Sequence, residues 1–444
     1  MDTRRIILFV IFSFSVLFLW QAWQQEHMPP PPPKPAASAP AAAPGAAPPP
    51  RDVPVPSVAP AVPAAVPGTP PTSAPAGAPA VPPITIRTDL YTAEVDPVGG
   101  VISLVSLARH RDATDTTKPY LALQRTAERT FVAQAGLLGE GMPNHRTQWT
   151  PQPGPRELAA GADRVELRLT ATAANGDPVV KVLTFHRGSY LIDVAFDVTN
   201  KGAAPVAPYA YFQLTRDSKS AVVQSSMAPA SYVGPVVYND KDNFKKVEFG
   251  EIDKLAADAS RKSPFQKSAD NGWVAMIEHY FVAAWVPSDE KRTPREFFVR
   301  RLDGGLYAAG VIVPVGTIAP GATGEVRVPL YVGPQDQDVL AQTAKGLDLV
   351  VDYGIFTVLA APLFWLLKWL HGLIGNWGWA IVVMTIMIKA VFYPLNAAAA
   401  RSMGKMKIIA PKMKALQEQY ANDKQQLQIK MMEMYKTEKI NPLG

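Results

Sequence analysis

The sequence has no cysteine among its 444 residues. That absence excludes disulfide bonds, thiolate metal sites and thiol nucleophiles at once. HExxH, GxSxG, the P-loop and the dinucleotide-binding glycine fingerprint are missing as well. Glu278 and His279 are adjacent, but adjacency does not provide the converging side chains of an acid–base pair. The remaining histidines of the β-rich and later regions are scattered, and we interpret them as structural or exposed: His110, His145, His186 and His371. We predict a protein that is not an enzyme and that holds no cofactor or metal.

Charged residues are absent from residues 6–23, an apolar run long enough to cross a bilayer as a helix. Arg4 and Arg5 precede the run, so the positive-inside rule keeps the N-terminus in the cytoplasm. A cleaved signal peptide is the alternative, but residues 21–28 are bulky and polar and contain no small-residue cleavage site. We therefore predict an uncleaved N-terminal anchor over residues 1–28.

Residues 29–83 are a low-complexity tract of proline and alanine that holds half of the chain's 44 prolines. Such a composition lacks the apolar side chains that build a core and favours extended polyproline conformations. We predict a disordered linker that acts as a spacer and buries nothing. A docking tract for a proline-binding partner is the alternative, but nothing in the tract resembles a selected ligand motif.

Residues 84–345 have the alternation that is typical of half-buried strands. Val165, Leu167 and Leu169 alternate with polar residues, and two further runs repeat the pattern. These runs are Ile192, Val194, Phe196 and Val198, and then Val326, Val328 and Leu330. We predict an antiparallel domain built as one large sandwich or two packed sheets, with one short helix at residues 251–257.

Residues 346–375 contain a second apolar stretch, at 352–373. If it crossed the membrane, the apolar span after it would cross back and leave the basic end of the chain outside, against the positive-inside bias. Pro362, Lys368 and His371 also interrupt it. We predict an amphipathic helix that lies in the outer interface, with Trp365 and Trp369 at the level of the lipid headgroups.

Residues 376–395 are predicted to be the second transmembrane helix, which ends near Tyr393 and Pro394. Residues 396–444 come next as a cytoplasmic helical hairpin, because residues 401–444 hold nine Lys or Arg against four Asp or Glu. Its first helix has a seam with spacings of three and four, interrupted by Pro411, and its second helix covers residues 424–439. The predicted seam consists of Met403, Met406, Ala410, Met413, Gln417 and Tyr420, with Leu427, Met431 and Met434 opposite.

Lys389 is a charge inside the second apolar span, about 9 Å from its cytoplasmic end. Its ammonium group could reach the interface along the flexible stem, or it could face a polar cavity and attract acidic groups of a passing chain. Eight of the 13 methionines lie between Met384 and Met434, where they could pack the hairpin or contact varied apolar partners. Several lysines nearby could contact anionic lipid or ribosomal RNA, or form a solvated face. The hairpin residues that we select as candidate contacts for substrate or ribosome are Met403, Met406, Lys407, Met413, Lys414, Met431 and Met434.

Four stretches together carry a resemblance to a known family: residues 1–23, 84–107, 351–420 and 430–444. In these stretches the chain resembles the Gram-negative members of the YidC/Oxa/Alb family of membrane protein insertases. The resemblance covers the chain except for the Pro/Ala tract. It implies a multi-pass protein of the inner membrane with a cytoplasmic N-terminus and a large periplasmic β-supersandwich, similar to galactose mutarotase, that contacts the Sec translocon.

The resemblance further implies a hydrophilic groove between five membrane helices, open to the cytoplasm and to the bilayer. The family's groove cation is usually arginine, and Lys389 matches its position. The hairpin, residues 400–439, matches the region that receives nascent membrane proteins and meets the ribosome and signal-recognition components. The family continues beyond NPLG with four more membrane helices, so we expect this sequence to be a fragment of a longer protein.

Two other functions remain as alternatives. One is a membrane-anchored periplasmic carbohydrate-binding or mutarotase-like domain, which would explain the β-rich region but not Lys389 or the basic hairpin. The other is a structural chaperone that works only together with the Sec translocon.

Overall fold

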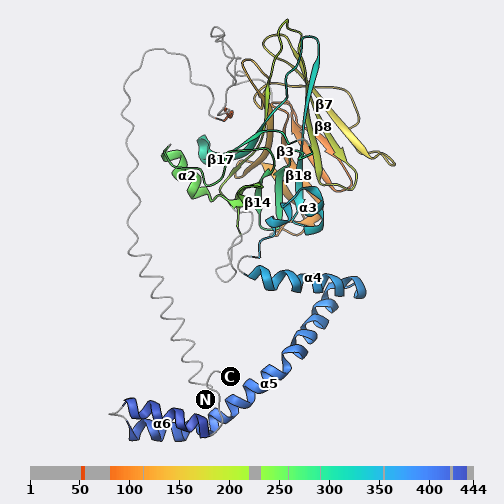
Figure 1. Cartoon of the computed structure of the whole chain (residues 1–444). Helices are drawn as coiled ribbons and strands as arrows, with labels where there is room; N and C mark the ends of the chain where they lie inside the picture. Colours follow the sequence, from red (N-terminus) through yellow and green to blue (C-terminus); the bar gives the residue numbers. More distant parts are fainter. Residues whose placement is uncertain are drawn as a thin grey trace. The chain divides into compact units, whose positions relative to one another are not determined.

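The computed structural model in Figure 1 describes residues 52–55, 81–113, 115–219, 232–258, 260–290, 292–353, 356–420 and 424–437. The predicted N-terminal anchor and most of the predicted linker lie outside these residues. The described residues form a large β-domain and, after it in the chain, three helices (Figure 1).

Two nine-stranded sheets, in which all pairings between the named strands are antiparallel, form the β-domain. The first sheet has the strand order β1-β2-β3-β4-β5-β10-β17-β16-β13. Its strands are β1 (Ile84–Arg87), β2 (Tyr91–Asp96), β3 (Val101–Arg111), β4 (Pro119–Arg125), β5 (Thr130–Leu138), β10 (Tyr209–Asp217), β17 (Leu306–Pro314), β16 (Arg295–Arg301) and β13 (Ser268–Ala269). The second sheet has the order β12-β11-β14-β15-β18-β9-β8-β7-β6. Its strands are β12 (Asn243–Lys246), β11 (Gly234–Asn239), β14 (Trp273–Glu278), β15 (Phe281–Trp285), β18 (Thr323–Pro334), β9 (Leu191–Thr199), β8 (Pro178–His186), β7 (Arg164–Thr172) and β6 (Thr150–Pro151).

Helices are few in the β-domain and long in the region after it. The β-domain carries α2 (Phe249–Ala257), α3 (Gln337–Thr343) and the 3₁₀ turns η1 (Asp303–Gly305) and η2 (Leu347–Val350). The three later helices are α4 (Thr357–Ile374), α5 (Trp377–Gln419) and α6 (Lys424–Thr437).

The main core lies between the two sheets and is continuous across them. Its centre contains Phe196 of β9, Phe212 of β10 and Trp285 of β15, with ring centroids 6.0 and 5.1 Å apart along the series. Burial of each large apolar side chain contributes about 1.5–3 kcal/mol. The strands β7, β9 and β18 contain the three alternating runs and direct their apolar residues into this core. The alternation predicted from the sequence is confirmed.

A buried lysine joins the two sheets. Lys181 of β8 is 1% exposed, and its Nζ donates to the backbone oxygens of Gly99 (3.1 Å), Gly100 (2.7 Å) and Ala135 (3.2 Å). Burial lowers the pKa of this ammonium group to about 7.

The turn between β2 and β3 passes close to the loop that carries His145. Gly99 adopts a φ of 81°, and a Cβ there would lie 2.0 Å from the backbone oxygen of His145. The turn between β2 and β3 consequently requires glycine and fixes the loop that carries His145.

The boundary between the β-domain and the predicted interfacial helix was placed too early. Leu347 and Val350 of η2 are buried with Leu340 of α3 against Tyr238 and Trp273 on the outer face of the second sheet. The Asp336 side chain caps α3 by accepting from the backbone N–H groups of residues 338 and 339. Residues 346–350 thus belong to the β-domain, and the helix begins only at Thr357.

Two further differences from the sequence predictions concern continuity. The helix α5 runs unbroken through Pro411, where we expected a kink or restart, and it also continues past Pro394, where we predict that the membrane-spanning part ends. A proline removes one intrahelical hydrogen bond but does not oblige a long helix to stop. Asp52 of the predicted linker hydrogen-bonds to the β-domain, and Val53 packs on it, so the expectation that the tract buries nothing is wrong for this segment.

Candidate functional site

The candidate site lies on α5. The first residues of this helix are held by defined capping interactions. Gly375 takes a left-handed φ of 72° and its N–H donates to the His371 oxygen at 2.7 Å, which ends α4. The Asn376 side chain then caps α5 by accepting from the Trp379 N–H at 3.2 Å. The rings of His371 and Trp377 stack across this turn at 3.9 Å. The α4–α5 junction is therefore a fixed corner in the chain.

Both helices at this corner have the length and composition of a membrane span. Thr357–Ile374 has a mean hydropathy of 1.5, and Trp377–Arg401 has a mean hydropathy of 1.7. At 1.5 Å per residue, α5 is about 64 Å long, roughly twice the thickness of a bilayer's hydrocarbon core. Only part of α5 can lie within a membrane.

Lys389 lies on an exposed stripe of polar side chains within the apolar half of α5. Thr385 precedes it by four residues and Tyr393 comes four residues after it, so the three share one face of the helix. The Thr385 hydroxyl donates to the Ile381 oxygen at 2.8 Å, and Tyr393 is 70% exposed. Asn396 continues the stripe. Our sequence reasoning selected Lys389 alone, although the four-residue spacing of Thr385 and Tyr393 was a usable signal.

The second half of α5 packs against α6, as Figure 1 shows. Ile409 is 2% exposed, and Met413, Leu416 and Tyr420 are half-buried at spacings of three and four. Leu427, Met431 and Met434 are half-buried on α6. The seam of α5 thus contains Ile409 and Leu416 where we expected Ala410 and Gln417, both of which are exposed.

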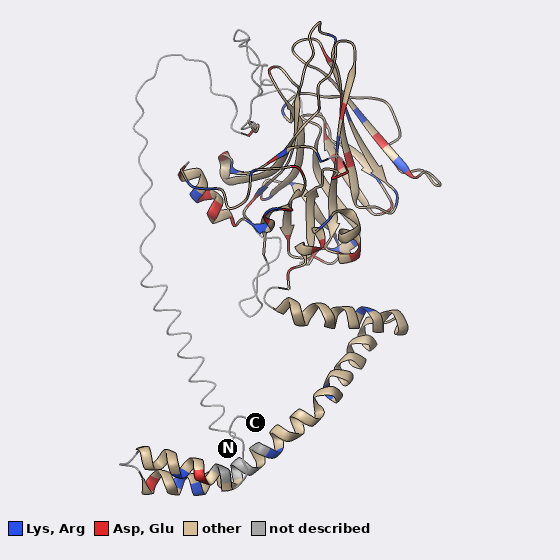
Figure 2. Ribbon diagram, viewed as in Figure 1, with Lys and Arg blue, Asp and Glu red and all other residues tan. Residues whose placement is uncertain are grey.

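The candidate contact residues of the hairpin divide into two groups. Met413, Met431 and Met434 lie among the half-buried seam residues, whereas Met403 is 63% exposed and Lys414 is exposed. The backbone at Met406 and Lys407 is helical, and their side chains lie outside the described part of the structure. Figure 2 shows that charged residues are sparse on α4 and the apolar half of α5 and frequent on α6 and the end of α5.

The β-domain does not form the acid–base pair that adjacency of Glu278 and His279 could have suggested. Glu278 is 3% exposed and accepts from the Tyr120 hydroxyl at 2.7 Å and from Arg129 and Arg216 at 2.9 and 3.0 Å. The His279 ring instead meets the Tyr280 ring edge to face, with ring centroids 3.9 Å apart. Within the described residues, no group of three or more His, Cys, Asp or Glu is placed to hold a metal ion.

Two protein-family models match this chain and define the class of protein to which it belongs. The model of the YidC periplasmic domain matches residues 83–366, and that of the 60Kd inner membrane protein matches residues 369–444. The β-domain and the helices after it therefore have the organisation of an inner-membrane protein with a periplasmic domain.

Named relatives then define the family. The chain is 46% identical over its whole length to a membrane protein insertase YidC of Nitrosospira multiformis, covering 78% of that protein. It is 47% identical to the one of Aromatoleum aromaticum and 48% identical to that of Dechloromonas aromatica, covering 78% and 77% of them. The chain belongs to the YidC family of membrane protein insertases.

Solved structures give lower similarity. A crystal structure of an active YidC insertase matches with a TM-score of 0.32 and 16% identity, covering 81% of this chain and 68% of that one. YidC of Thermotoga maritima matches with a TM-score of 0.31 and 14% identity over 77% and 81% of the two chains. A galactose mutarotase related enzyme of Lactobacillus acidophilus matches with a TM-score of 0.36 and 10% identity, covering 56% of this chain and 97% of that one.

Proposed function

We propose that this protein inserts other proteins into the inner membrane and assists their folding, alone or with the Sec translocon. Family membership supports the activity. The observation that carries the mechanism is the polar stripe of Thr385, Lys389 and Tyr393 on an otherwise apolar helix. Polar and charged side chains within a span are costly in lipid and mark a polar cavity or a substrate path.

In this mechanism Lys389 forms part of a hydrophilic groove within the membrane. The hydrophilic tail of a nascent membrane protein enters the groove, where the ammonium group attracts its acidic residues more strongly than it would in water. The apolar segment of the substrate then partitions into lipid, and its burial contributes about 25 cal/mol per Å². No bond is broken and no cofactor is needed, so the protein acts without enzymatic catalysis.

Depletion of the protein from its own cells tests the function. Newly made inner-membrane proteins with short translocated tails should remain uninserted and inaccessible to protease added from the periplasmic side. A secreted protein that uses the Sec translocon serves as the control and should be exported. Normal insertion after complete depletion would contradict the function, and insertion by the purified protein in liposomes without Sec would show that it acts alone.

The hairpin of α5 and α6 is proposed to receive nascent chains at the cytoplasmic face and to contact the ribosome or signal-recognition components. The exposed Met403 offers a flexible apolar contact, and Lys414 offers a cation to acidic lipid or RNA. Met413, Met431 and Met434 would support this surface by holding the two helices together.

We further propose that α5 alone crosses the membrane in this part of the chain, while α4 lies in the periplasmic interface. Lys368 of α4 forms an ion pair with Asp338 of α3, a helix of the β-domain. A lysine that contacts a periplasmic domain this far along α4 is at the water interface, which a helix crossing at that point would not allow.

Single cysteines in the cysteine-free chain test this topology. Val358 and Leu373 lie near opposite ends of α4 and are 88% and 68% exposed. In intact cells permeable at the outer membrane, a membrane-impermeant maleimide should label both V358C and L373C. A cysteine in place of Met432 on α6 is the control for the cytoplasmic side and should react only after lysis. Labelling of V358C without L373C would contradict the interfacial placement.

A further inference from the structure

A short segment of the Pro/Ala tract is bound to the β-domain. The Asp52 carboxylate accepts hydrogen bonds through Oδ2 from His145 Nε2 at 3.0 Å and from Arg146 Nε at 2.8 Å. The backbone oxygen of Asp52 accepts from Arg300 Nη2 at 2.6 Å and from Gln213 Nε2 at 3.3 Å. Both the side chain and the main chain of one residue are therefore recognised.

The site is built on the outer face of the first sheet, across β5, β10, β17 and β16. Tyr211 and Gln213 point away from the main core, yet each is 0% exposed. Gln213 lies opposite Gln134 of β5, and its amide donates to the Gln134 oxygen at 2.8 Å. Arg300 also donates to the Gln213 oxygen at 3.1 Å. The polar groups that meet Asp52 are thus themselves fixed by hydrogen bonds.

The His145 ring is held in a defined orientation. The Tyr211 hydroxyl hydrogen-bonds His145 Nδ1 and accepts from the His145 backbone N–H at 3.2 Å. With Nδ1 as the acceptor from the Tyr211 hydroxyl, Nε2 carries the proton that it donates to Asp52. The close approach of Gly99 to the His145 oxygen fixes the loop from the other side. Arg146 provides a positive charge opposite the carboxylate, with its Nη2 at 2.7 Å from Asp52 Oδ2.

The electrostatics of the site favour a carboxylate. Burial by itself would raise the pKa of the Asp52 carboxyl, but hydrogen bonds from His145 and Arg146 outweigh it and lower the pKa to about 2. Burial lowers the pKa of Arg300 to about 10, so its guanidinium stays charged at neutral pH.

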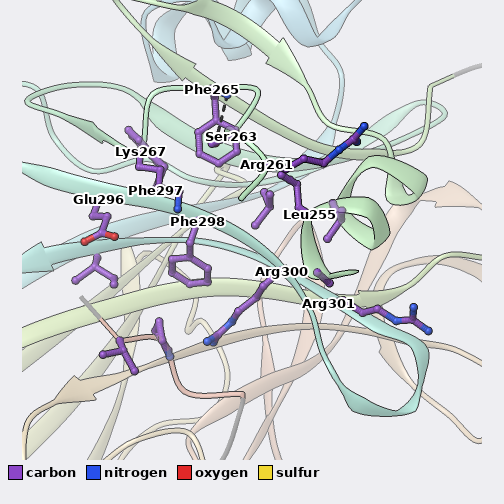
Figure 3. A pocket seen from close by; sticks show the side chains of 16 residues that line it. Leu255, Arg261, Ser263, Phe265, Lys267, Glu296, Phe297, Phe298, Arg300 and Arg301 are labelled. Carbon is purple, nitrogen blue, oxygen red and sulfur yellow. Dashed lines mark hydrogen bonds between the residues drawn. The ribbon is translucent and has the colours of Figure 1, made fainter. Parts of the chain in front are cut away.

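Apolar contacts continue the recognition along the segment. Val53 packs against a small cluster of Leu138, Tyr211 and Ile312. Pro54 is buried, whereas Val55 is 77% exposed, so the burial of the segment falls sharply after Pro54. Both residues line a pocket of about 490 Å³, beside β16 and α2. Figure 3 shows this pocket, with Phe298 and Arg300 directed to one side of the strand and Arg301 to the other.

We propose that this outer face is a binding site for an extended peptide with the pattern Asp–Val–Pro, and that residues 52–54 of the chain's own tract occupy it as a tether. Asp52 is the only acidic residue in residues 29–83, so the tract offers a single register for docking. The inference is independent of how the protein inserts its substrates.

The tether shortens the distance that the tract can span. A Pro/Ala-rich chain spans about 3.1 Å per residue when extended, which gives residues 29–83 a reach of about 170 Å. With Asp52 bound, the distance from the predicted N-terminal anchor to the β-domain is limited to a reach of about 70 Å. The tether therefore limits how far the predicted anchor can lie from the face of the β-domain that binds Asp52.

Thiol reactivity measures the docking in the intact protein, because the chain has no cysteine background. V53C and V55C are each prepared and alkylated with maleimide in detergent at neutral pH. V53C should react about tenfold more slowly than V55C. Adding D52N should raise the V53C rate to within about twofold of V55C, whereas D52E, which keeps the carboxylate, should retain most of the protection. D163N, at an exposed aspartate of the loop before β7, is the matched control and should change neither rate.

Each other outcome would overturn the proposal. Equal rates at positions 53 and 55 would mean that the segment is not bound. Protection of V53C that persists in D52N would mean that the carboxylate is not the group that the site recognises. Because Asp52 belongs to the bound segment and not to a strand, D52N should leave the thermal unfolding of the β-domain almost unchanged, and this can be checked on the same samples.

Discussion

Replacing Lys389 by glutamate is expected to reduce the insertion of substrates with acidic tails by about tenfold or more, while Lys389→Arg should retain most of the activity. At about 8 Å and an effective dielectric constant of about 20, two unit charges attract by about 2 kcal/mol, and 1.4 kcal/mol corresponds to a factor of ten. Reversing the charge replaces this attraction by repulsion. Arginine keeps the charge at this position, and its planar fork adds hydrogen-bonding geometry that lysine lacks.

The measurement is the rate at which translocated tails become accessible to protease in cells that carry the variant at the chromosomal locus. A substrate series in which only the number of acidic tail residues changes isolates the charge effect. Lys262→Glu is the control, because Lys262 is exposed in the β-domain and lies outside the membrane helices and the hairpin. If Lys389→Ala supported equal insertion for every tail, the charge of Lys389 would have no role in substrate capture.

The second large effect is expected in the core of the β-domain. Glu278→Gln should lower the free energy of unfolding by about 3–5 kcal/mol, because it removes the counter-charge of a buried ion pair. Arg216 is 0% exposed and pairs with Glu278 at 3.0 Å, and its Nη1 already has no hydrogen-bond partner among the described residues. Arg129, 18% exposed at its side chain, loses the same partner.

Chemical unfolding of the intact protein, monitored by near-ultraviolet circular dichroism, measures this change. Glu325→Gln is the matched control, since Glu325 forms an exposed ion pair with Arg327 and such pairs contribute about 0–1 kcal/mol. Similar losses for the two variants would contradict the view that Glu278 is held in the core as part of a structural network with Tyr120, Arg129 and Arg216.

The strands were predictable because their burial pattern has a period of two that the sequence displays directly. Val165, Leu167 and Leu169 point inward from β7 as expected, and the short helix expected at residues 251–257 is α2. Sheet order was not predictable, since pairings such as β5 with β10 and β9 with β18 join strands that are far apart in the chain. Local alternation gives no information about which distant strand is the neighbour.

The predictions about the continuity of α5 and about the Pro/Ala tract were wrong for different reasons. A kink or restart was expected at Pro411 because proline disfavours helix interiors, but a helix with stable turns on both sides continues through it. The docking of Asp52 was missed because its partners His145, Arg146, Gln213 and Arg300 are spread over three separate regions of the sequence. The available signal was one acidic residue in a tract that otherwise has no acid.

The continuity of α5 has a mechanical consequence. With its apolar half in the bilayer, as proposed, the stretch from Leu395 to Gln419 is an arm of about 36 Å that projects into the cytoplasm and carries α6. A tilt of about 10° at the membrane surface would move the end of this arm by about 6 Å, so a small adjustment of the membrane helix to a substrate is amplified where α5 meets α6. Pro394 and Pro411 are the points where a hydrogen bond is missing, and the stiffness of the arm is lowest there.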